Sequence, residues 1–260
     1  MRLLFIGDII GKAGRKILSE YLDNLLDKYK IDLCIANGEN AAGGFGITHK
    51  IGQSLFNMGI NVISSGNHIW DKKEALEYLP KENNLLRPAN YPKGVPGSGS
   101  TFFQFPDGSY AGVLNLSGRV FMPNLDCPFQ TADREIPELK KKAKFIIVDM
   151  HAEATSEKIA MGWYLDGKVS AIIGTHTHVQ TADEKILPKG TAYITDAGMT
   201  GPVDSVIGMK KEIAIFRFKT SIPEKFSVAS GEIQLNAVLV EMDSKSGLAK
   251  EIKRIQLTSS

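Results

Sequence analysis

The apolar positions in the first third of the chain alternate between short continuous runs and helical spacing. Short runs predict buried strands, and apolar residues repeated every three or four positions predict helices that pack on a sheet. The predicted elements are a strand at 3–7, a helix at 17–29, a strand at 31–36, a helix at 48–58 and a strand at 62–65. A further helix is expected to open at Asp71, because Asp71 and Glu74 fit a capping box. The chain therefore begins as an alternating α/β fold.

The pattern becomes irregular between about residues 85 and 137, where prolines interrupt short strand candidates at 101–105 and 110–116. We interpret this stretch as an irregular insertion or rim of one domain that spans residues 1–260. Regular order returns with predicted strands at 145–150, 169–173 and 191–195 and a predicted helix at 156–164. The rest of the chain, especially 232–242 and 251–257, is expected to form strands of a mixed or antiparallel sheet.

Composition places the chain among ordinary globular proteins, with 43% apolar and 23% charged residues. The formal net charge of +2 does not indicate a nucleic-acid partner, and the basic stretch at 140–144 is most simply a solvated turn. Two cysteines are too few for a disulfide framework and favour a reducing compartment. The apolar start is too short for a signal peptide, and no apolar run approaches the roughly 18 residues of a membrane span. We therefore expect a soluble cytoplasmic protein with no membrane partner.

Four of the five histidines lie in three short motifs, each directly after an apolar run that predicts a strand. These motifs are Gly66-Asn67-His68, Met150-His151 and Gly174-Thr175-His176-Thr177-His178. Two further apolar runs end in carboxylate motifs, Gly7-Asp8 and Asn37-Gly38-Glu39-Asn40. Because the carboxyl ends of parallel strands face a common crevice, side chains from these five places are expected to converge. The sequence therefore predicts a polynuclear metal site.

The candidate donors are carboxylates, amides and imidazoles, without a thiolate. They are Asp8, Glu39, Asn40, Asn67, His68, His151, His176 and His178. Such a set suits a hard or borderline divalent metal such as manganese, iron or zinc, and it holds enough donors for two ions. Glu39 is the candidate for a bridging ligand, because a carboxylate has two acceptor oxygens. His176 and His178 would point in opposite directions from an extended segment, whereas a turn would let each serve one metal.

Two glycine-containing loops allow a functional and a structural interpretation. The loop at 41–48 precedes a helix, so its amides could approach a phosphate or the base and sugar of a substrate. It could equally be a flexible turn with Thr48 as the helix N-cap. The loop at 198–201 could line the same crevice, with Thr200 as a hydrogen-bond donor, or form only a structural turn. Arg87 and Arg119 could neutralise a phosphate, but their spacing does not place either near the metals.

These motifs resemble those of the calcineurin-like metallophosphoesterase superfamily, which include an Asp after the first strand, a Gly-Asn-His, a later His and a Gly-x-His-x-His. The resemblance runs through nearly the whole chain, and the YmdB-like branch is more similar still. The segments that carry it are Gly7-Asp8-Ile9-Ile10-Gly11, Asn37-Gly38-Glu39-Asn40, Gly66-Asn67-His68-Ile69-Trp70-Asp71 and Gly198-Met199-Thr200-Gly201-Pro202. The chain departs from the superfamily at Ile10, where an Asp-x-His motif would have its His, and at Glu39, where an Asp usually bridges. Both departures are shared by the YmdB-like branch.

The resemblance implies a four-layer α/β/β/α sandwich of two mixed sheets, whereas the residues alone indicate only an α/β protein. It implies two divalent metal ions, iron or manganese, with zinc as an alternative, and it implies that Asn40 helps to replace the missing ligand. The metal ligands would be Asp8, Glu39, Asn40, Asn67, His151, His176 and His178. His68 is then not needed as a ligand, and its place beside the metals suits a catalytic proton donor or a group that stabilises charge at phosphorus.

The activity that the resemblance implies is hydrolysis of a phosphodiester by a metal-activated water, with His68 protonating the departing oxygen. Cyclic nucleotides, especially 2',3'-cyclic nucleoside monophosphates, are the expected small-molecule substrates. The motifs leave open a phosphomonoester or an RNA end as the substrate and a homo-oligomer as the assembly. The alternative is a regulatory protein that binds a nucleotide or a partner and catalyses slowly, and the intact ligand set argues against a dead enzyme.

Overall fold

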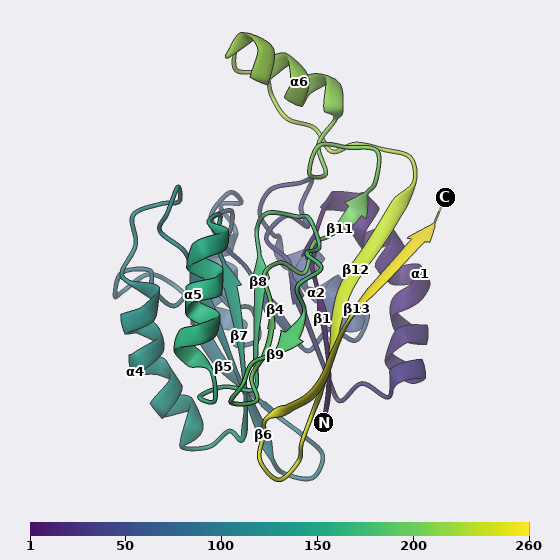
Figure 1. Cartoon of the computed structure of the whole chain (residues 1–260). Coiled ribbons are helices and arrows are strands. Elements are labelled where there is room, and N and C mark those ends of the chain that lie inside the picture. Colours follow the sequence, from purple (N-terminus) through teal and green to yellow (C-terminus); the bar gives the residue numbers. More distant parts are fainter. Residues whose placement is uncertain (260) are drawn as a thin grey trace.

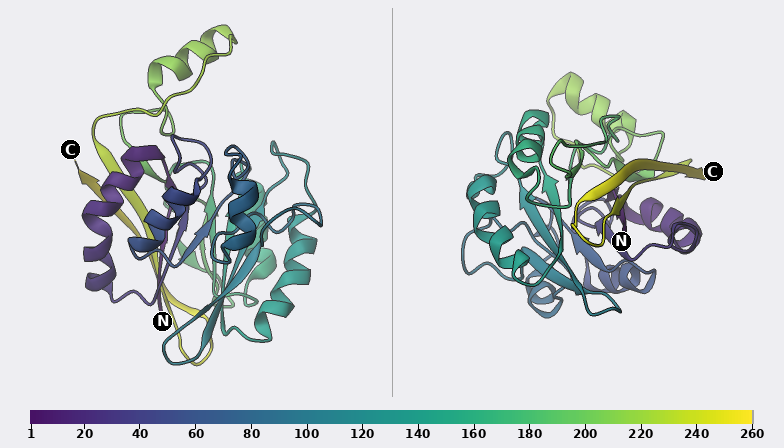
Figure 2. Two further views of the ribbon diagram at one scale, coloured as in Figure 1. Left: turned by 180° about the vertical axis from the view of Figure 1, so that it is seen from behind. Right: turned by 60° about the horizontal axis from the view of Figure 1, so that its bottom comes forward.

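Two β-sheets pack face to face and carry helices on their outer faces (Figure 1). The computed structural model describes residues 1–259. Helices α1 (Gly11–Tyr29) and α2 (His49–Asn57) pack on the first sheet. Helices α4 (Pro128–Lys140) and α5 (Thr155–Leu165) pack on the second. Figure 2 shows the same layers from two further directions. The layer order is α/β/β/α, which confirms the predicted sandwich of two mixed sheets.

The first sheet contains seven strands. Their order is β2 (Asp8–Ile9), β11 (Met199–Pro202), β12 (Ile233–Met242), β1 (Arg2–Ile6), β3 (Leu33–Asn37) and β4 (Val62–Ser64), with β13 (Ala249–Ser259) paired to β12. Strands β1, β3 and β4 run parallel, and β12 runs antiparallel to β1. The carboxyl ends of the parallel strands therefore lie together at one end of the sheet.

The second sheet contains six strands. Their order is β5 (Ser100–Gln104), β6 (Tyr110–Ser117), β7 (Phe145–His151), β8 (Ala171–Thr175), β10 (Ala192–Ile194) and β9 (Lys185–Ile186). The four central strands are parallel, and the two edge strands β5 and β9 are antiparallel to their neighbours. This sheet also presents the carboxyl ends of parallel strands at one end.

Alternation along β1 divides its buried side chains between two cores. Leu3 and Phe5 pack between the sheets, in a cluster that includes Ile147 of β7. Leu4 and Ile6 belong to the cluster that joins the first sheet to α1. Because successive strand residues face opposite sides, a strand that is covered on both sides appears in the sequence as a continuous apolar run. The short apolar runs predicted as strands are explained in this way.

The predicted helix that opens at Asp71 is wrong. Helix α3 contains only Ala75–Tyr78 and continues into the 3₁₀ turn η1 (Leu79–Lys81). The Asp71 carboxylate lies 2.8 Å from Nδ1 of His68 instead of capping a helix. The Asp71 carboxylate is therefore not available to cap a helix, because it already contacts His68 on the preceding turn. The capping-box pattern in the sequence reflects this contact with a site residue.

The irregular stretch between 85 and 137 supplies strands β5 and β6 and most of helix α4. Part of this stretch therefore belongs to the second sheet and to the helix layer that covers it. Proline obscured the helix in the sequence pattern. Pro128 lies at the start of α4, where a helix has no need of the missing N–H, and Pro137 lies inside it.

Helix α6 (Lys211–Thr220) stands away from the two sheets on two connecting segments (Figures 1 and 2). We call residues 203–229 the arm. The sequence pattern favoured strands here and gave no sign of the helix, because the apolar residues of α6 do not fall on one side. Of its residues Ala214 is buried, whereas Ile215, Phe216 and Phe218 are exposed. Among residues 1–259, no helix combines the length and the apolar character needed to cross a membrane.

Candidate metal centre

Polar side chains from both sheets meet where the parallel strands end. The eight candidate residues come from β2 and the segments after β3 and β4 in the first sheet, and from β7 and the segment after β8 in the second. Each of them contacts at least one other member: Asp8, Glu39, Asn40, Asn67, His68, His151, His176 and His178. The structure therefore brings together every site residue proposed from the sequence.

Glu39 lies in the middle of this cluster and is fully buried. Its Oε1 is 3.1 Å from Nε2 of His151 and accepts a hydrogen bond from the Asn40 amide at 3.4 Å. Its Oε2 accepts a hydrogen bond from the backbone N–H of His68 at 3.0 Å. Asn67 Oδ1 approaches the same His151 nitrogen at 3.1 Å. The two oxygens of Glu39 thus face different neighbours, as a bridging ligand requires.

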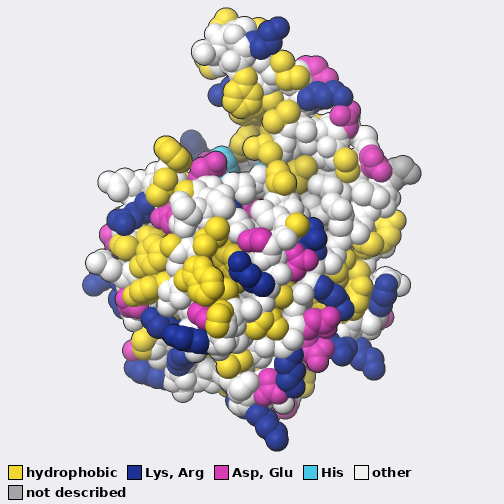
Figure 3. Space-filling model, in the orientation of Figure 1, with side chains coloured by type: hydrophobic (Ala, Val, Ile, Leu, Met, Phe, Trp, Pro, Cys, Tyr) yellow, Lys and Arg dark blue, Asp and Glu magenta, His cyan; other side chains and the backbone are white. Residues whose placement is uncertain are grey.

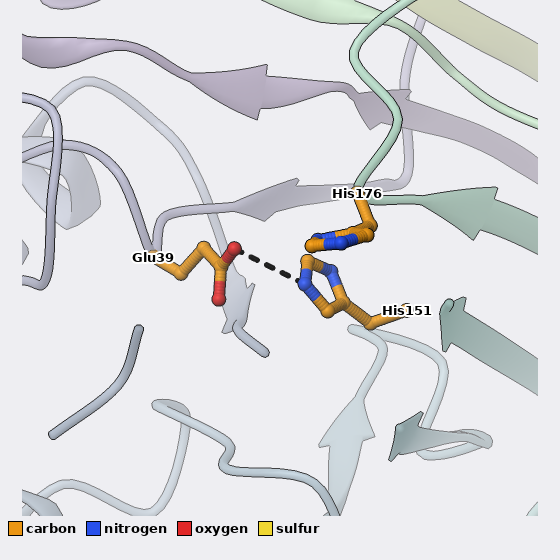
Figure 4. Close-up of side chains that lie close together, drawn as sticks. All are labelled: Glu39, His151 and His176. Carbon is orange, nitrogen blue, oxygen red and sulfur yellow. Dashed lines mark ion pairs between the residues drawn. The ribbon is translucent and has the colours of Figure 1, made fainter. Parts of the chain in front are cut away.

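The turn expected between His176 and His178 is present. Their φ angles are 96° and 65°, in the left-handed region that residues other than glycine occupy rarely and at an energetic cost. His176 lies with Glu39 and His151 in a group whose ligand atoms are all within 4.8 Å of one another (Figure 4). His178 Nε2 instead lies 3.5 Å from Asp8 Oδ1. The left-handed turn therefore sends the two imidazoles to different parts of the cluster.

Burial and charge set the protonation states of these ligands. Burial alone would raise the pKa of Glu39, but the neighbouring His151 outweighs burial and holds that pKa below its usual value. Burial is likewise outweighed at Asp8, whose pKa His178 lowers to about 2. Burial lowers the pKa of His176 to about 3. At neutral pH the carboxylates are therefore ionised and His176 is neutral. The same carboxylates outweigh burial at the other two histidines, raising the pKa of His151 and raising that of His178 to about 9, so a metal cation would displace their Nε2 protons on binding.

Hydrogen bonds behind two of the histidines direct their Nε2 atoms at the cluster. The Thr175 hydroxyl donates to Asp149 at 2.7 Å and therefore accepts from the Nδ1–H of His151, 2.9 Å away. The Nδ1–H of His178 donates to the carbonyl oxygen of Ile207 at 2.9 Å. Burial raises the pKa of the Asp149 carboxyl to about 7. Partners of this kind fix the orientation and tautomer of an imidazole that binds a metal through its other nitrogen.

His68 is more exposed than the other three histidines of the cluster. Its side chain is 29% exposed, and its Nδ1 lies 2.8 Å from the Asp71 carboxylate. Its ring meets the edge of Phe45 with the ring centres 5.0 Å apart. Because Asp71 occupies Nδ1, Nε2 is the nitrogen left for proton transfer to a substrate.

The residues present fit metal ions. Oδ1 of Asp8 is fully buried and accepts no hydrogen bond from the residues that the structure describes. Buried polar atoms almost always have a partner, and a cation would supply one here. The donors are carboxylate, amide and imidazole groups, which suits manganese, iron or zinc better than a thiophilic ion. The cluster is therefore a candidate metal centre.

A cavity of about 460 Å³ opens on this cluster. Glu39, His68, His176 and His178 line part of it, and much of the remaining lining consists of apolar side chains of the arm. Figure 3 shows apolar side chains gathered where the arm joins the rest of the molecule, with a histidine beside them. The candidate metal centre is therefore reached through a cavity that is polar in one part and apolar in another.

Residues left open in the sequence analysis divide between the site and the scaffold. Gly44 and Phe45 of the 41–48 loop line the cavity, while Thr48 accepts a capping hydrogen bond from the N–H of Ile51. Thr200 is buried and donates to a backbone carbonyl, so its role is structural. Arg87 donates to three backbone carbonyls and is likewise structural.

The polar residues that support the candidate ligands were not predicted from the sequence. The carboxylate of Asp196 accepts hydrogen bonds from the N–H of Thr177 at 3.1 Å and from its hydroxyl at 2.6 Å. Asp196 directly follows the predicted strand at 191–195 and could have been found by the rule that collected the other residues. Asp149 gave no such signal, because it lies inside the apolar run of β7.

Comparison with known proteins agrees with this geometry. Residues 4–255 match the model of the family described as YmdB-like protein. The chain is 52% identical over 255 residues to a protein of Bacillus subtilis named 2',3'-cyclic-nucleotide 2'-phosphodiesterase, covering 98% of this chain and 96% of that protein.

Two crystal structures have the same fold over all or nearly all of their length. One is a hypothetical protein from Thermus thermophilus, 41% identical, with a TM-score of 0.94 and full coverage of both chains. The other is described as a novel phosphatase from Mycoplasma pneumoniae, 39% identical, with a TM-score of 0.93 and coverage of 99% of this chain and 93% of that one. Since the family model and the relative extend over nearly the whole sequence, this chain belongs to the YmdB-like family.

Proposed function

We propose that this protein is a phosphodiesterase that hydrolyses 2',3'-cyclic nucleoside monophosphates at a centre of two divalent metal ions. The observation that carries the proposal is the convergence of seven candidate ligands, Glu39 among them, from both sheets, with His68 beside them. The relative from Bacillus subtilis, which is 52% identical, is named for this reaction. Opening the ring at the 2' oxygen would leave a 3'-nucleotide.

The ligands would divide into two groups that share Glu39. Asp8, Asn40 and His178 contact one another on one side, through the 3.5 Å approach of Asp8 to His178 and a 3.3 Å contact of Asn40 with His178. Asn67, His151 and His176 would form the other group, in which His151 lies 3.1 Å from both Asn67 and Glu39. Iron or manganese is the expected metal, with zinc as an alternative.

The bound metals would neutralise phosphate charge and lower the pKa of a water molecule toward neutrality. The side chains of the protein would contribute the proton transfer and the orientation of the reacting groups. His68 would donate its Nε2 proton to the departing 2' oxygen, and the Asp71 carboxylate, 2.8 Å from Nδ1, would hold the ring in orientation. The imidazoles of His151 and His178, which would bind the metals, are held from behind by the Thr175 hydroxyl and by the Ile207 carbonyl, which limits their movement.

The cavity supports a nucleotide over the other substrates. A volume of about 460 Å³ is within the range of sites for small molecules, whereas an RNA end would need an open basic groove. The intact ligand set supports catalysis over a purely regulatory role. We also propose that residues 1–260 act as a single domain, because the site takes ligands from both sheets. A reducing cytoplasmic compartment fits the two free cysteines, Cys34 and Cys127.

Metal analysis of the purified protein, combined with a substrate panel, tests the proposal. We expect two equivalents of metal and fastest hydrolysis of 2',3'-cyclic nucleotides among cyclic nucleotides, phosphomonoesters and RNA with a terminal cyclic phosphate. Two bound ions with no turnover on this panel would instead support the regulatory alternative. Faster hydrolysis of phosphomonoesters would identify a phosphatase.

A further inference from the structure

The cavity beside the metal centre has an apolar part that the chemistry at phosphorus does not use. Three of its aromatic residues are Phe45, which follows β3, and Phe218 and Phe226 of the arm. Met209 of the arm lies among them and is buried. A phosphate has no use for such a surface, so another part of the ligand must account for it.

We propose that this apolar part of the cavity, and Phe218 in particular, is the subsite for the nucleobase of the substrate. The inference rests on the proposed function, because it assumes that a cyclic phosphate occupies the metal end of the same cavity. In a 2',3'-cyclic nucleotide the ribose joins the phosphate to a flat base with two π-faces. Aromatic side chains recognise such faces by stacking, without a need for hydrogen bonds to the base.

Phe218 is suited to this role because it is not used in packing. Its side chain is 84% exposed although it lines the cavity, so its ring keeps a surface available for a ligand. The neighbouring Phe226 is held in place on the arm, since the Arg217 guanidinium lies 4.1 Å from the centre of its ring. One aromatic ring is thus fixed, and the other is free to adjust to bases of different size.

The arm is also tied directly to the metal centre. The carbonyl oxygen of Ile207 accepts the Nδ1–H of His178 at 2.9 Å. Beyond Ile207, backbone hydrogen bonds from Lys210 to Ser227 at 2.9 Å and from Ala229 to Gly208 at 3.0 Å join the two connecting segments. The base of the arm is therefore anchored beside a proposed ligand. This anchoring keeps Phe218 and the proposed metal ligands on the wall of the same cavity.

Stacking on an apolar surface predicts a particular specificity. This part of the cavity offers few polar groups that could distinguish the Watson–Crick edges of the bases, so all four nucleotides should be accepted. Purines should bind more tightly than pyrimidines, because they stack over a larger area. A substrate without a base should lose this contribution.

The test compares 2',3'-cyclic AMP with glycerol 1,2-cyclic phosphate, which has the five-membered cyclic phosphate and no base. Phe218→Ala in the metal-loaded enzyme should lower kcat/KM for the nucleotide by roughly 5- to 150-fold, chiefly through KM, as expected for one lost stacking contact. It should leave kcat/KM for the glycerol compound unchanged. Phe216→Ala is the matched control, because Phe216 lies two residues away on α6, is exposed and does not line the cavity.

Three results would overturn the subsite. The first is a native KM of Phe218→Ala for 2',3'-cyclic AMP, and the second is an equal loss of kcat/KM on both substrates. The third is the same loss of kcat/KM in Phe216→Ala, accompanied by a change in sedimentation, which would show that the arm joins two copies of the chain. Calorimetric measurement of 3'-AMP binding tests the proposed nucleobase subsite independently of turnover. Weaker binding to Phe218→Ala than to wild type supports the subsite even if the cyclic phosphates are not hydrolysed, in which case only the proposed function fails.

Discussion

The ammonium group of Lys158 lies 2.8 Å from Oδ2 of Asp196, and both side chains are buried beneath the turn that carries His176 and His178. The same ammonium donates to the backbone carbonyl of Thr175 and to the hydroxyl of Thr177, each at 3.2 Å. Neither residue faces the cavity. The pair therefore supports the metal centre from within the protein, by holding a strained segment of backbone in place.

Replacing Lys158 by Met tests this support. The change would leave the Asp196 carboxylate buried without its cation, so we expect the free energy of unfolding to fall by about 3–5 kcal/mol. Urea unfolding of the metal-free proteins measures the loss. Lys16→Met is the control, because Lys16 pairs with Glu20 at 3.6 Å on the exposed side of α1, and the loss there should be about 0–1 kcal/mol. Equal stabilities of the two variants would contradict a supporting role for the pair.

His68→Ala should separate catalysis from metal binding. His68 contacts Glu39 through its backbone N–H, which the substitution retains, so two equivalents of metal should remain bound. Loss of the proton donor should lower kcat on 2',3'-cyclic AMP by roughly 10²- to 10⁴-fold. Elemental analysis and initial rates provide the two measurements. A variant with full metal content and native turnover would show that the proton comes from another group.

Thr175→Val should weaken metal binding without touching a ligand. The substitution keeps the shape of the side chain and removes the hydroxyl that accepts from His151 and donates to Asp149. We expect metal affinity to fall by about 10- to 100-fold, measured by competition with a chelator.

A control for that variant exists in the same sheet. Thr191 is also fully buried, and its hydroxyl donates to the carbonyl of Val169 at 2.7 Å, away from the cluster. Thr191→Val should therefore reduce stability and leave metal affinity unchanged. If both variants lose metal equally, general loosening of the fold is responsible and the specific role of Thr175 is refuted.

The sequence was sufficient to predict which side chains converge, because each lies in or directly after a short strand. In a parallel sheet the end of a strand determines where the next side chain lies, so Asp8, Glu39 and His151 could be brought together without coordinates. Gly66 is also explained by this convergence of strand ends. A Cβ at this position would lie 2.0 Å from Nε2 of His151, so the glycine of the Gly-Asn-His motif allows the backbone to approach the ligand closely.

Other features depended on contacts that no local pattern contains. Lys158 lies on a helix whose spacing explains it as an ordinary polar residue, and its role appears only when the helix meets the turn at Thr177. Helix α6 carries apolar residues on several sides because it packs on little of the protein, so periodicity could not identify it. Asp71 is a different case: it fitted a capping box, but its carboxylate contacts His68 three residues earlier, and no helix begins there.

Asp183 predicts a pH dependence of stability that is separate from the metal centre. Burial would raise its pKa, but hydrogen bonds from the hydroxyls of Thr181 and Thr195 and from the N–H of Thr195 outweigh burial and lower the pKa below 3.8. A carboxylate with a lowered pKa stabilises the folded state above its unfolded pKa, and this contribution is lost as the pH falls through the folded pKa. Asp183→Asn should therefore be less stable than wild type at pH 6.

The difference between Asp183→Asn and wild type should shrink as the pH falls below about 4, because the Asp183 carboxyl then takes up a proton in the unfolded chain first and, at lower pH, in the folded protein. Denaturant unfolding of the metal-free proteins between pH 3 and 7 measures it, and Asp23→Asn, at an exposed position of α1, should show no such trend. A difference that stays constant down to pH 3 would mean that Asp183 contributes by the shape of its side chain alone. A difference that narrows would assign the contribution to its charge, acting through the two threonines that it links.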